Sequence, residues 1–203
     1  MNYSSNENLQ QYLIQKGVFV NMEGFSQECH EQTQFLSEAA SRCVNILEIG
    51  FNAGHSAETF LSSNEDVYVT SFDIGEHPYV KHGKMFIDKQ YQNRHTLVLG
   101  DSLKTIPEYS AKFPNSKFDL IFIDGGHDYN NAYNDIVNCA KLATKDTLLI
   151  VDDIVNESKR HRPHTIGPTK AWKDLMTKHV ITEDGHITLC DGRGFSWGKY
   201  VMP

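Results

Sequence analysis

The chain has 203 residues, of which 39% are hydrophobic and 22% are charged, and its formal net charge is −7. This composition excludes collagen-like, low-complexity and wholly disordered proteins, and the length suits a single domain with a substantial core. The acidic balance argues against nucleic acid as the main partner, because contacts to phosphate favour a basic patch.

The four cysteines, Cys29, Cys43, Cys139 and Cys190, form no C-x-x-C pair and fit no zinc-binding spacing. We expect reduced thiols in a cytoplasmic protein. The N-terminal stretch MNYSSNENLQQYLIQKG lacks the basic and apolar regions of a signal peptide. No stretch approaches the ~20 apolar residues that cross a bilayer, so we also expect no membrane contact.

Residues 1–40 differ in pattern from the rest of the chain. Residues 1–25 are polar, with a short helical patch at 9–14, and a helix is expected over 26–41 with Ser26 as its N-cap. We interpret residues 1–40 as a helical appendage or lid, and residues 41–203 as the main domain.

From residue 44 on, apolar strands alternate with helical segments. The predicted strands are 44–50, 67–74, 95–100, 118–124 and 146–153, and the predicted helices are 55–63, 80–91, 102–113 and 129–143. After a polar loop, a helix over 167–179 and two strands, 180–189 and 194–201, close the chain. This pattern predicts an α/β fold, a Rossmann-like doubly wound sheet with helices on both faces and a terminal antiparallel pair at one edge.

Polar residues and glycines gather where the predicted strands end, and in such sheets ligands bind beyond these ends. They are Glu48, Gly50, Gly54, Asp73, Gly100, Asp101, Ser102, Asp124, Gly125, Gly126, His127, Asp152 and Asp153. The glycines of LEIGFNAGHS bracket a strand-to-helix turn, where glycine allows a positive φ and a close ligand. Asp73, about twenty residues later, has the position of a carboxylate that binds ribose hydroxyls. These features predict a nucleoside-bearing ligand.

Several segments together resemble class I S-adenosylmethionine-dependent methyltransferases. LEIGFNAGHS is similar to the first motif of that family, SFDIG to its ribose-binding strand, GDSLKTIP to its adenine-side segment, and FDLIFIDGGHDY and LLIVDDI to its fourth- and fifth-strand motifs. The resemblance runs from about residue 44 to 154. It implies the strand order 3-2-1-4-5-7-6 with an antiparallel last strand, and S-adenosylmethionine as cofactor. The implied cofactor-binding residues are Glu48, Gly50, Asn52, Gly54, Ser56, Asp73, Asp101, Ser102 and Asp124. For Ser102, a helix cap is an equally good interpretation.

Within the class, the likeness is greatest to metal-dependent O-methyltransferases of the catechol and antibiotic-sugar kinds. It implies a divalent cation held by Asp124, Asp152 and Asp153. Three carboxylates at adjacent strand ends repel one another unless a cation or a proton neutralises them, and an all-oxygen site suits Mg²⁺. The alternative is that Asp124 only shapes the cofactor pocket and the Asp-Asp pair caps a loop.

His127 follows Asp124 by three residues, the spacing at which catechol-type relatives hold their general base. We expect His127 and Asp124 to be catalytic, with the imidazole taking the proton of a hydroxyl group. The alternative is a helix cap. The segment 156–168, with Arg160, His161, Arg162 and His164, is interpreted as part of an acceptor pocket, as a lid, or as a solvated loop. Tyr129 and Trp172 are candidates for flanking an acceptor ring, although Tyr129 also begins an apolar stripe.

The sequence thus predicts a Mg²⁺-assisted O-methyltransferase for a small hydroxylated acceptor, a sugar or a phenol, in a chain that can pair as a homodimer. Three alternatives remain open. They are a metal-independent methyltransferase acting on another atom, a nucleoside-binding module without chemistry, and a nicotinamide-dependent oxidoreductase. The last is disfavoured because the chain lacks G-x-G-x-x-G after its first strand.

Overall fold

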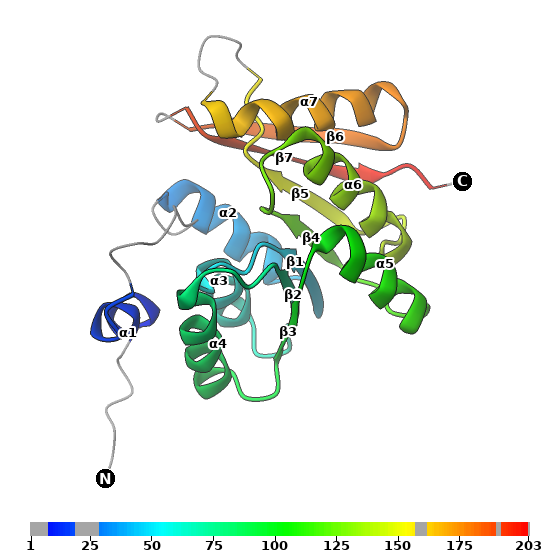
Figure 1. Cartoon of the computed structure of the whole chain (residues 1–203). Helices are drawn as coiled ribbons and strands as arrows, with labels where there is room; N and C mark the ends of the chain where they lie inside the picture. Colours follow the sequence, from blue (N-terminus) through cyan, green and yellow to red (C-terminus); the bar gives the residue numbers. More distant parts are fainter. Residues whose placement is uncertain (1–7, 19–28, 157–161, 190–191, 203) are drawn as a thin grey trace.

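The computed structural model of the chain describes residues 8–18, 29–156, 162–189 and 192–202 (Figure 1). Its strands are β1 (Asn45–Ile49), β2 (Tyr68–Asp73), β3 (His95–Leu99), β4 (Leu120–Ile123), β5 (Leu148–Asp152), β6 (Ile181–Thr188) and β7 (Gly194–Tyr200). Its helices are α1 (Leu9–Gln15), α2 (His30–Ala40), α3 (His55–Ser63), α4 (Pro78–Gln90), α5 (Ser102–Lys112), α6 (Tyr129–Cys139) and α7 (Pro163–Thr177), with a short 3₁₀ helix η3 (Ala140–Leu142) after α6.

The seven strands form one sheet in the order β3-β2-β1-β4-β5-β7-β6. The first five strands pair in parallel, whereas β7 runs antiparallel to both β5 and β6. Helices α2, α3 and α4 cover one face, and α5, α6 and α7 cover the other (Figure 1). The predicted fold class and strand order are therefore confirmed.

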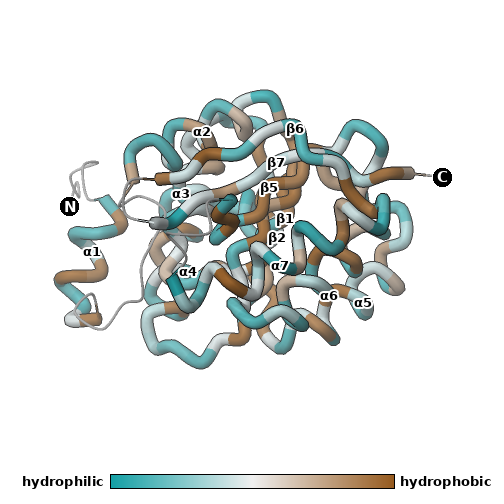
Figure 2. Tube along the Cα trace, turned by 90° about the horizontal axis from the view of Figure 1, so that it is seen from above, coloured by the Kyte–Doolittle hydropathy of each residue, from teal (hydrophilic) through white to brown (hydrophobic). Residues whose placement is uncertain are grey.

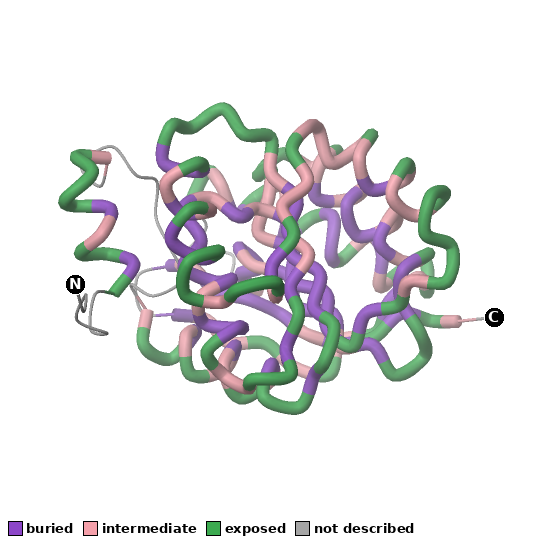
Figure 3. Tube along the Cα trace, turned by 90° about the horizontal axis from the view of Figure 1, so that it is seen from below, coloured by how far each residue is buried: buried purple, intermediate pink, exposed green. Residues whose placement is uncertain are grey.

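Both faces of the central strands are buried, and successive residues of a strand serve opposite faces. Ile46, Phe122 and Ile150 belong to the core under α2 and α3, whereas Leu47 and Ile121 belong to the core under α5 and α6. Viewed from above, the strands form a hydrophobic band between more polar helices (Figure 2), and viewed from below the buried positions concentrate in the same band (Figure 3). This alternation explains why the strands read as continuous apolar runs.

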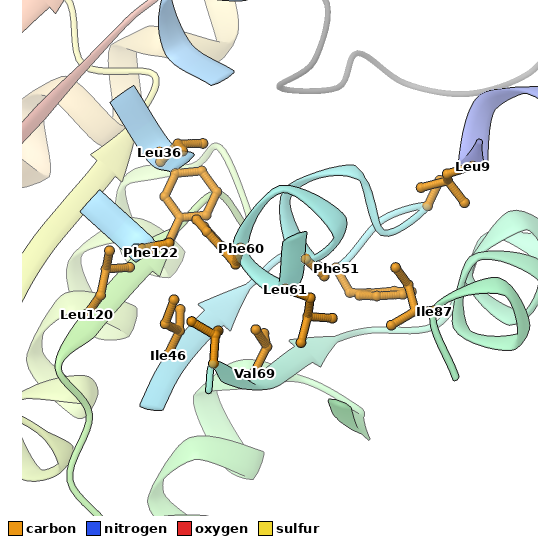
Figure 4. Packing of buried hydrophobic residues seen from close by; sticks show 14 of the residues in the cluster. Leu9, Leu36, Ile46, Phe51, Phe60, Leu61, Val69, Ile87, Leu120 and Phe122 are labelled. Atoms are coloured by element: carbon orange, nitrogen blue, oxygen red, sulfur yellow. The ribbon is translucent and has the colours of Figure 1, made fainter. Parts of the chain in front are cut away.

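The core under α2 and α3 joins residues that are distant in the sequence. Phe60 of α3 and Phe122 of β4 meet edge to face with ring centroids 5.7 Å apart, and Leu36 of α2 lies beside them (Figure 4). Leu9 and Leu13 of α1 are also fully buried in this core. Both N-terminal helices thus pack onto the main domain, while a lid function for residues 1–40 stays a prediction.

Several helix ends differ from the sequence-based expectation, and prolines account for two of the differences. Helix α4 begins at Pro78 and α7 at Pro163, because proline suits the first helical position, where its missing N–H is not needed. Pro168, expected near the start of the last helix, instead lies inside α7. Helix α2 begins at His30 after Cys29, and the predicted cap Ser26 lies outside the described residues.

Two further expectations concern the whole chain. Cys29, Cys43 and Cys139 are free thiols, as predicted, and Cys190 lies outside the described residues. None of the helices in the described part of the chain has the length and apolar character required to cross a membrane.

Candidate active site

A cavity of about 740 Å³ lies beyond the carboxyl ends of β1, β2, β4 and β5, where parallel sheets of this kind bind their ligands. Its volume falls in the range of roughly 300–1,000 Å³ that is typical of small-molecule sites. Many of the residues predicted from the sequence line it: Gly50, Asn52, Asp73, Asp101, Ser102, Asp124, His127, Asp152 and Asp153. The strand ends therefore bring the predicted cofactor and metal residues into one continuous space.

One end of the cavity is built by the turn after β1. Gly50 has φ +92°, and a Cβ on this residue would stand 1.8 Å from the carbonyl oxygen of Asp124. Asp73 is held in place because its two carboxylate oxygens accept backbone N–H bonds, from Asn52 at 2.8 Å and from Gly75 at 2.7 Å. Since each carboxylate oxygen can accept a second hydrogen bond, Asp73 can still receive two hydroxyl groups of a ligand.

Glu48, Gly54 and Ser56 do not line the cavity. Gly54 closes the glycine turn, and Glu48 and Ser56 belong to the strand and the helix that the turn connects. Glu48 is fully buried and accepts hydrogen bonds from the hydroxyls of Ser56 and Ser71. Burial raises the pKa of Glu48 to about 7. These three residues therefore contribute to the predicted pocket by shaping the turn, with no direct surface on the cavity.

The adenine-side residues come from the start of α5. Asp101 is the N-cap of this helix and accepts the N–H of Leu103 at 3.0 Å, so the capping role considered for Ser102 belongs to its neighbour. The Ser102 hydroxyl instead lies beside Asp135, a fully buried carboxyl group on α6 whose pKa burial raises to about 7. The spacing of Asp135 in the sequence does not distinguish it from the polar face of α6, so only the structure identifies it.

At the other end of the cavity, three carboxylates lie close together. Burial raises the pKa of Asp124 well above its usual range, and the nearby charges of Asp152 and Asp153 raise it further. Burial and Asp153 likewise raise the pKa of Asp152. Two groups that the sequence analysis did not identify oppose these shifts: Arg193, which acts on Asp124 and Asp152, and the side chain of Gln32 on α2, which acts on Asp152.

The carboxylate of Asp153 lies close to two histidines. Its Oδ2 atom lies 3.0 Å from Nε2 of His127, and its Oδ1 atom lies 3.7 Å from Nε2 of His164. The two imidazole rings have centroids 5.6 Å apart. Asp153 has φ +60°, a left-handed conformation that turns its side chain away from the course of β5.

Among the described residues, Asp124, His127 and Asp153 offer ligand atoms that all lie within 4.8 Å of one another. This group shares Asp124 and Asp153 with the predicted metal site and contains His127 in place of Asp152. The raised pKa values of Asp124 and Asp152 reflect a charge repulsion that a divalent cation would relieve. The donor set therefore fits a divalent cation.

Other candidates lie away from the cavity surface. Trp172 is fully buried, and its indole N–H donates to Glu183 at 2.6 Å. The Tyr129 hydroxyl donates to Asp174 at 2.9 Å. Neither lines the cavity, so the interpretation of Tyr129 and Trp172 as walls around an acceptor ring is wrong. In the basic segment, Arg162 and His164 do line it, whereas Arg160 and His161 lie outside the described residues.

Comparison with known proteins agrees with this geometry. Residues 47–154 match a family described as a methyltransferase domain. No curated protein sequence matches the chain significantly.

Among solved structures, an O-methyltransferase from Bacillus cereus in complex with SAH is 17% identical, with a TM-score of 0.76 over 96% of this chain and 91% of that one. An O-methyltransferase from Streptomyces achromogenes involved in tomaymycin synthesis, in complex with SAM, is 14% identical, with a TM-score of 0.73 over 96% and 88%. A TDP-rhamnose 3'-O-methyltransferase of calicheamicin biosynthesis is 18% identical, with a TM-score of 0.64 over 98% and 96%. At these identities the likeness concerns the fold.

Proposed function

The chain belongs to the family of methyltransferase domains, and from this premise we propose that it moves a methyl group from S-adenosylmethionine to a hydroxyl oxygen of a small acceptor, assisted by a divalent cation. The observation that carries the proposal is the single cavity that connects Asp73 and the glycine turn with Asp124, His127 and Asp153. A methyl donor and an acceptor can share this space.

The cofactor would occupy the end near β1 and β2. Asp73 would accept the two ribose hydroxyls, because the N–H bonds from Asn52 and Gly75 fix its carboxylate. Gly50 and Asn52 would leave room for the amino-acid part, and Asp101 and Ser102 would lie beside the adenine. The solved structures of similar fold that contain SAH or SAM support this assignment.

The acceptor hydroxyl would lie near the Asp124–Asp153 end. A divalent cation bound there would lower the pKa of this hydroxyl and orient it. His127 is the proposed general base: with Nε2 turned toward Asp153, we assign proton acceptance to Nδ1. The oxygen then forms a bond to the methyl carbon while the bond from that carbon to sulfur breaks, which leaves a neutral thioether.

A sugar or a phenol is the proposed acceptor class, because either supplies a hydroxyl whose proton needs a base. The similar fold of a TDP-rhamnose 3'-O-methyltransferase supports the sugar alternative. Mg²⁺ remains the first cation to test on the carboxylates. We further propose that the protein is cytoplasmic, forms a homodimer and has no nucleic acid as a partner.

A second candidate is metal-free methyl transfer, which one observation favours. Nε2 of His127 already lies 3.0 Å from Oδ2 of Asp153, and Arg193 offsets part of the negative charge on Asp124 and Asp152. An imidazole held by a carboxylate can remove a proton without a cation.

Calorimetric titration of S-adenosylhomocysteine, first with EDTA and then with Mg²⁺ or Mn²⁺, tests the proposal on the full chain. We expect binding under both conditions, followed by turnover of sugar or phenol acceptors that EDTA abolishes. Turnover that survives EDTA would favour the metal-free mechanism. Binding of S-adenosylhomocysteine without turnover of any acceptor would point to a nucleoside-binding module. Binding of NADH but not of S-adenosylhomocysteine would contradict the proposal entirely.

A further inference from the structure

His164 lies in the first turn of α7, eleven residues after Asp153 in the sequence, yet it lines the active-site cavity. Asp153 presents one carboxylate oxygen to each histidine: Oδ2 faces Nε2 of His127, and Oδ1 faces Nε2 of His164. The two oxygens therefore face two different imidazoles, and the His164 side has no assigned function in the reaction described above.

We propose that His164 is a ligand of the active-site cation, and that this imidazole makes the site prefer a first-row transition cation such as Mn²⁺ or Co²⁺ over Mg²⁺. The inference rests on the cation of the proposed function and specifies its chemical class. Oδ1 of Asp153 and Nε2 of His164 would hold the cation, while Oδ2 of Asp153 orients His127 as the base. Asp124 would join them only after the His164 ring turns toward it, because His164 is not in the group of described residues whose ligand atoms lie within 4.8 Å of one another.

The distance between the two proposed ligand atoms fits a shared cation. Ligand nitrogen and oxygen atoms lie about 2.0–2.2 Å from such cations, so two of them stand about 3 Å apart at a right angle and about 3.5 Å apart in a tetrahedron. The distance from His164 Nε2 to Asp153 Oδ1 is 3.7 Å. The His164 side chain is 35% exposed, so its imidazole has room to turn toward a shared cation.

Helix α7 is fixed against both of the segments that carry the other groups. The Thr169 hydroxyl donates to the backbone oxygen of Asp153 at 3.3 Å and accepts the N–H of Val155 at 2.9 Å. Gly167 lies against the preceding loop, where an added Cβ would stand 2.3 Å from the carbonyl oxygen of His127. The position of His164 relative to Asp153 and His127 is therefore set by direct contacts of α7.

The chemistry of the donor set decides the class of cation. Mg²⁺ favours an all-oxygen octahedron and keeps several waters, whereas an imidazole nitrogen suits Mn²⁺, Fe²⁺, Co²⁺ and Ni²⁺ increasingly well. A site of carboxylates alone would show a smaller preference, because oxygen ligands follow the same order of affinity. Cation affinities can therefore distinguish a site that includes the His164 imidazole from a site of carboxylates alone.

The test compares Mg²⁺ and Co²⁺ binding to the full chain by calorimetry, with the visible absorption of Co²⁺ as a second readout. We expect the wild type to bind Co²⁺ at least about 10-fold more tightly than Mg²⁺. H164N should weaken Co²⁺ binding on the order of 10-fold or more and change its absorption spectrum, while Mg²⁺ binding changes much less. H164Q is the second variant if H164N does not fold.

Two histidine variants serve as comparisons. His30 is an exposed residue at the start of α2, so the variant H30N should bind both cations like the wild type. H127N should keep the preference for Co²⁺. An unchanged Co²⁺ affinity and spectrum in H164N would overturn the inference, as would a preference that H127N removes and H164N retains.

The same titrations separate this inference from the proposed function. If no cation binds while S-adenosylhomocysteine does, the inference and the cation-assisted mechanism both fail, and metal-free methyl transfer stands. If Co²⁺ binds through His164 while S-adenosylhomocysteine does not bind, the metal site stands and the methyltransferase proposal fails.

Discussion

Gly50 and Asp124 are in backbone contact across two neighbouring parallel strands: a Cβ on residue 50 would stand 1.8 Å from the carbonyl oxygen of Asp124. This contact joins the glycine turn to the residue that begins the acidic cluster. The two ends of the cavity therefore meet in a direct backbone contact between the glycine turn and Asp124.

Replacing Gly50 with Ala should destabilise the fold by several kcal/mol, roughly 3 or more, because the side chain overlaps a backbone atom and φ is +92°. Urea unfolding measures this loss. G17A is the matched control, since Gly17 also has a positive φ, +71°, but nothing within 4 Å of an added Cβ. Equal losses in the two variants would show that backbone strain alone, and not the contact with Asp124, is responsible.

Replacing Asp73 with Asn should weaken S-adenosylhomocysteine binding about 10–100-fold, because a hydrogen bond to a charged group contributes about 1.5–3 kcal/mol. Calorimetry provides the measurement. D66N, at an exposed position before β2, is the control and should leave the affinity unchanged. Wild-type affinity in D73N would remove Asp73 from the cofactor site.

Replacing His127 with Ala should reduce turnover ~10²-fold or more while leaving S-adenosylhomocysteine affinity intact, because the residue acts on the acceptor proton. Steady-state kinetics with an identified acceptor, combined with calorimetry, separates the two effects. H30A should behave like the wild type. Near-normal turnover in H127A would exclude His127 as the base.

Glu48 should make stability depend on pH. Burial raises its folded-state pKa to about 7 from a usual value of 4.5. Its contribution to stability is therefore fully present below about pH 4.5 and is lost as the pH rises through 7, a change of at most about 3 kcal/mol. E48Q, which carries no ionisable group, should lack this part of the pH dependence.

Urea unfolding of both proteins between pH 5 and pH 8 tests this expectation, and the wild type should lose stability relative to E48Q as the pH rises. The exposed substitution E65Q is the control and should follow the wild type. Parallel pH profiles for the wild type and E48Q would contradict the assignment.

The sheet could be predicted because its information is local. Runs such as LIFI in β4 are apolar at every position, which indicates a strand buried on both faces, and the glycines after β1 mark the turn. The strand order itself came from the resemblance to a known family. The start of α7 differs from the expected helix over 167–179, because Pro163 lies in a polar stretch that reads as a loop.

The composition of the site was less accessible. Asp152 is the last residue of β5 and shares the face of Ile150, toward α2 and Gln32, whereas Asp153 follows the strand with φ +60° and faces the histidines. Asp152 and Asp153 are thus adjacent in the sequence but have different surroundings in the structure. Gln32 and Arg193 reach the cluster from distant segments, so only the tertiary fold reveals them. His164, a candidate for the acceptor pocket from the sequence, reaches the cluster because α7 begins at Pro163.

The left-handed backbone of Asp153 also limits which substitutions the position accepts. Glycine, asparagine and aspartate adopt this conformation readily, and other residues do so at a cost. The codons of aspartate differ by one base from those of asparagine and from those of glycine. A single base change can therefore remove the negative charge at position 153 and retain the local backbone conformation. An uncharged variant of this position is thus one mutation away from the present sequence.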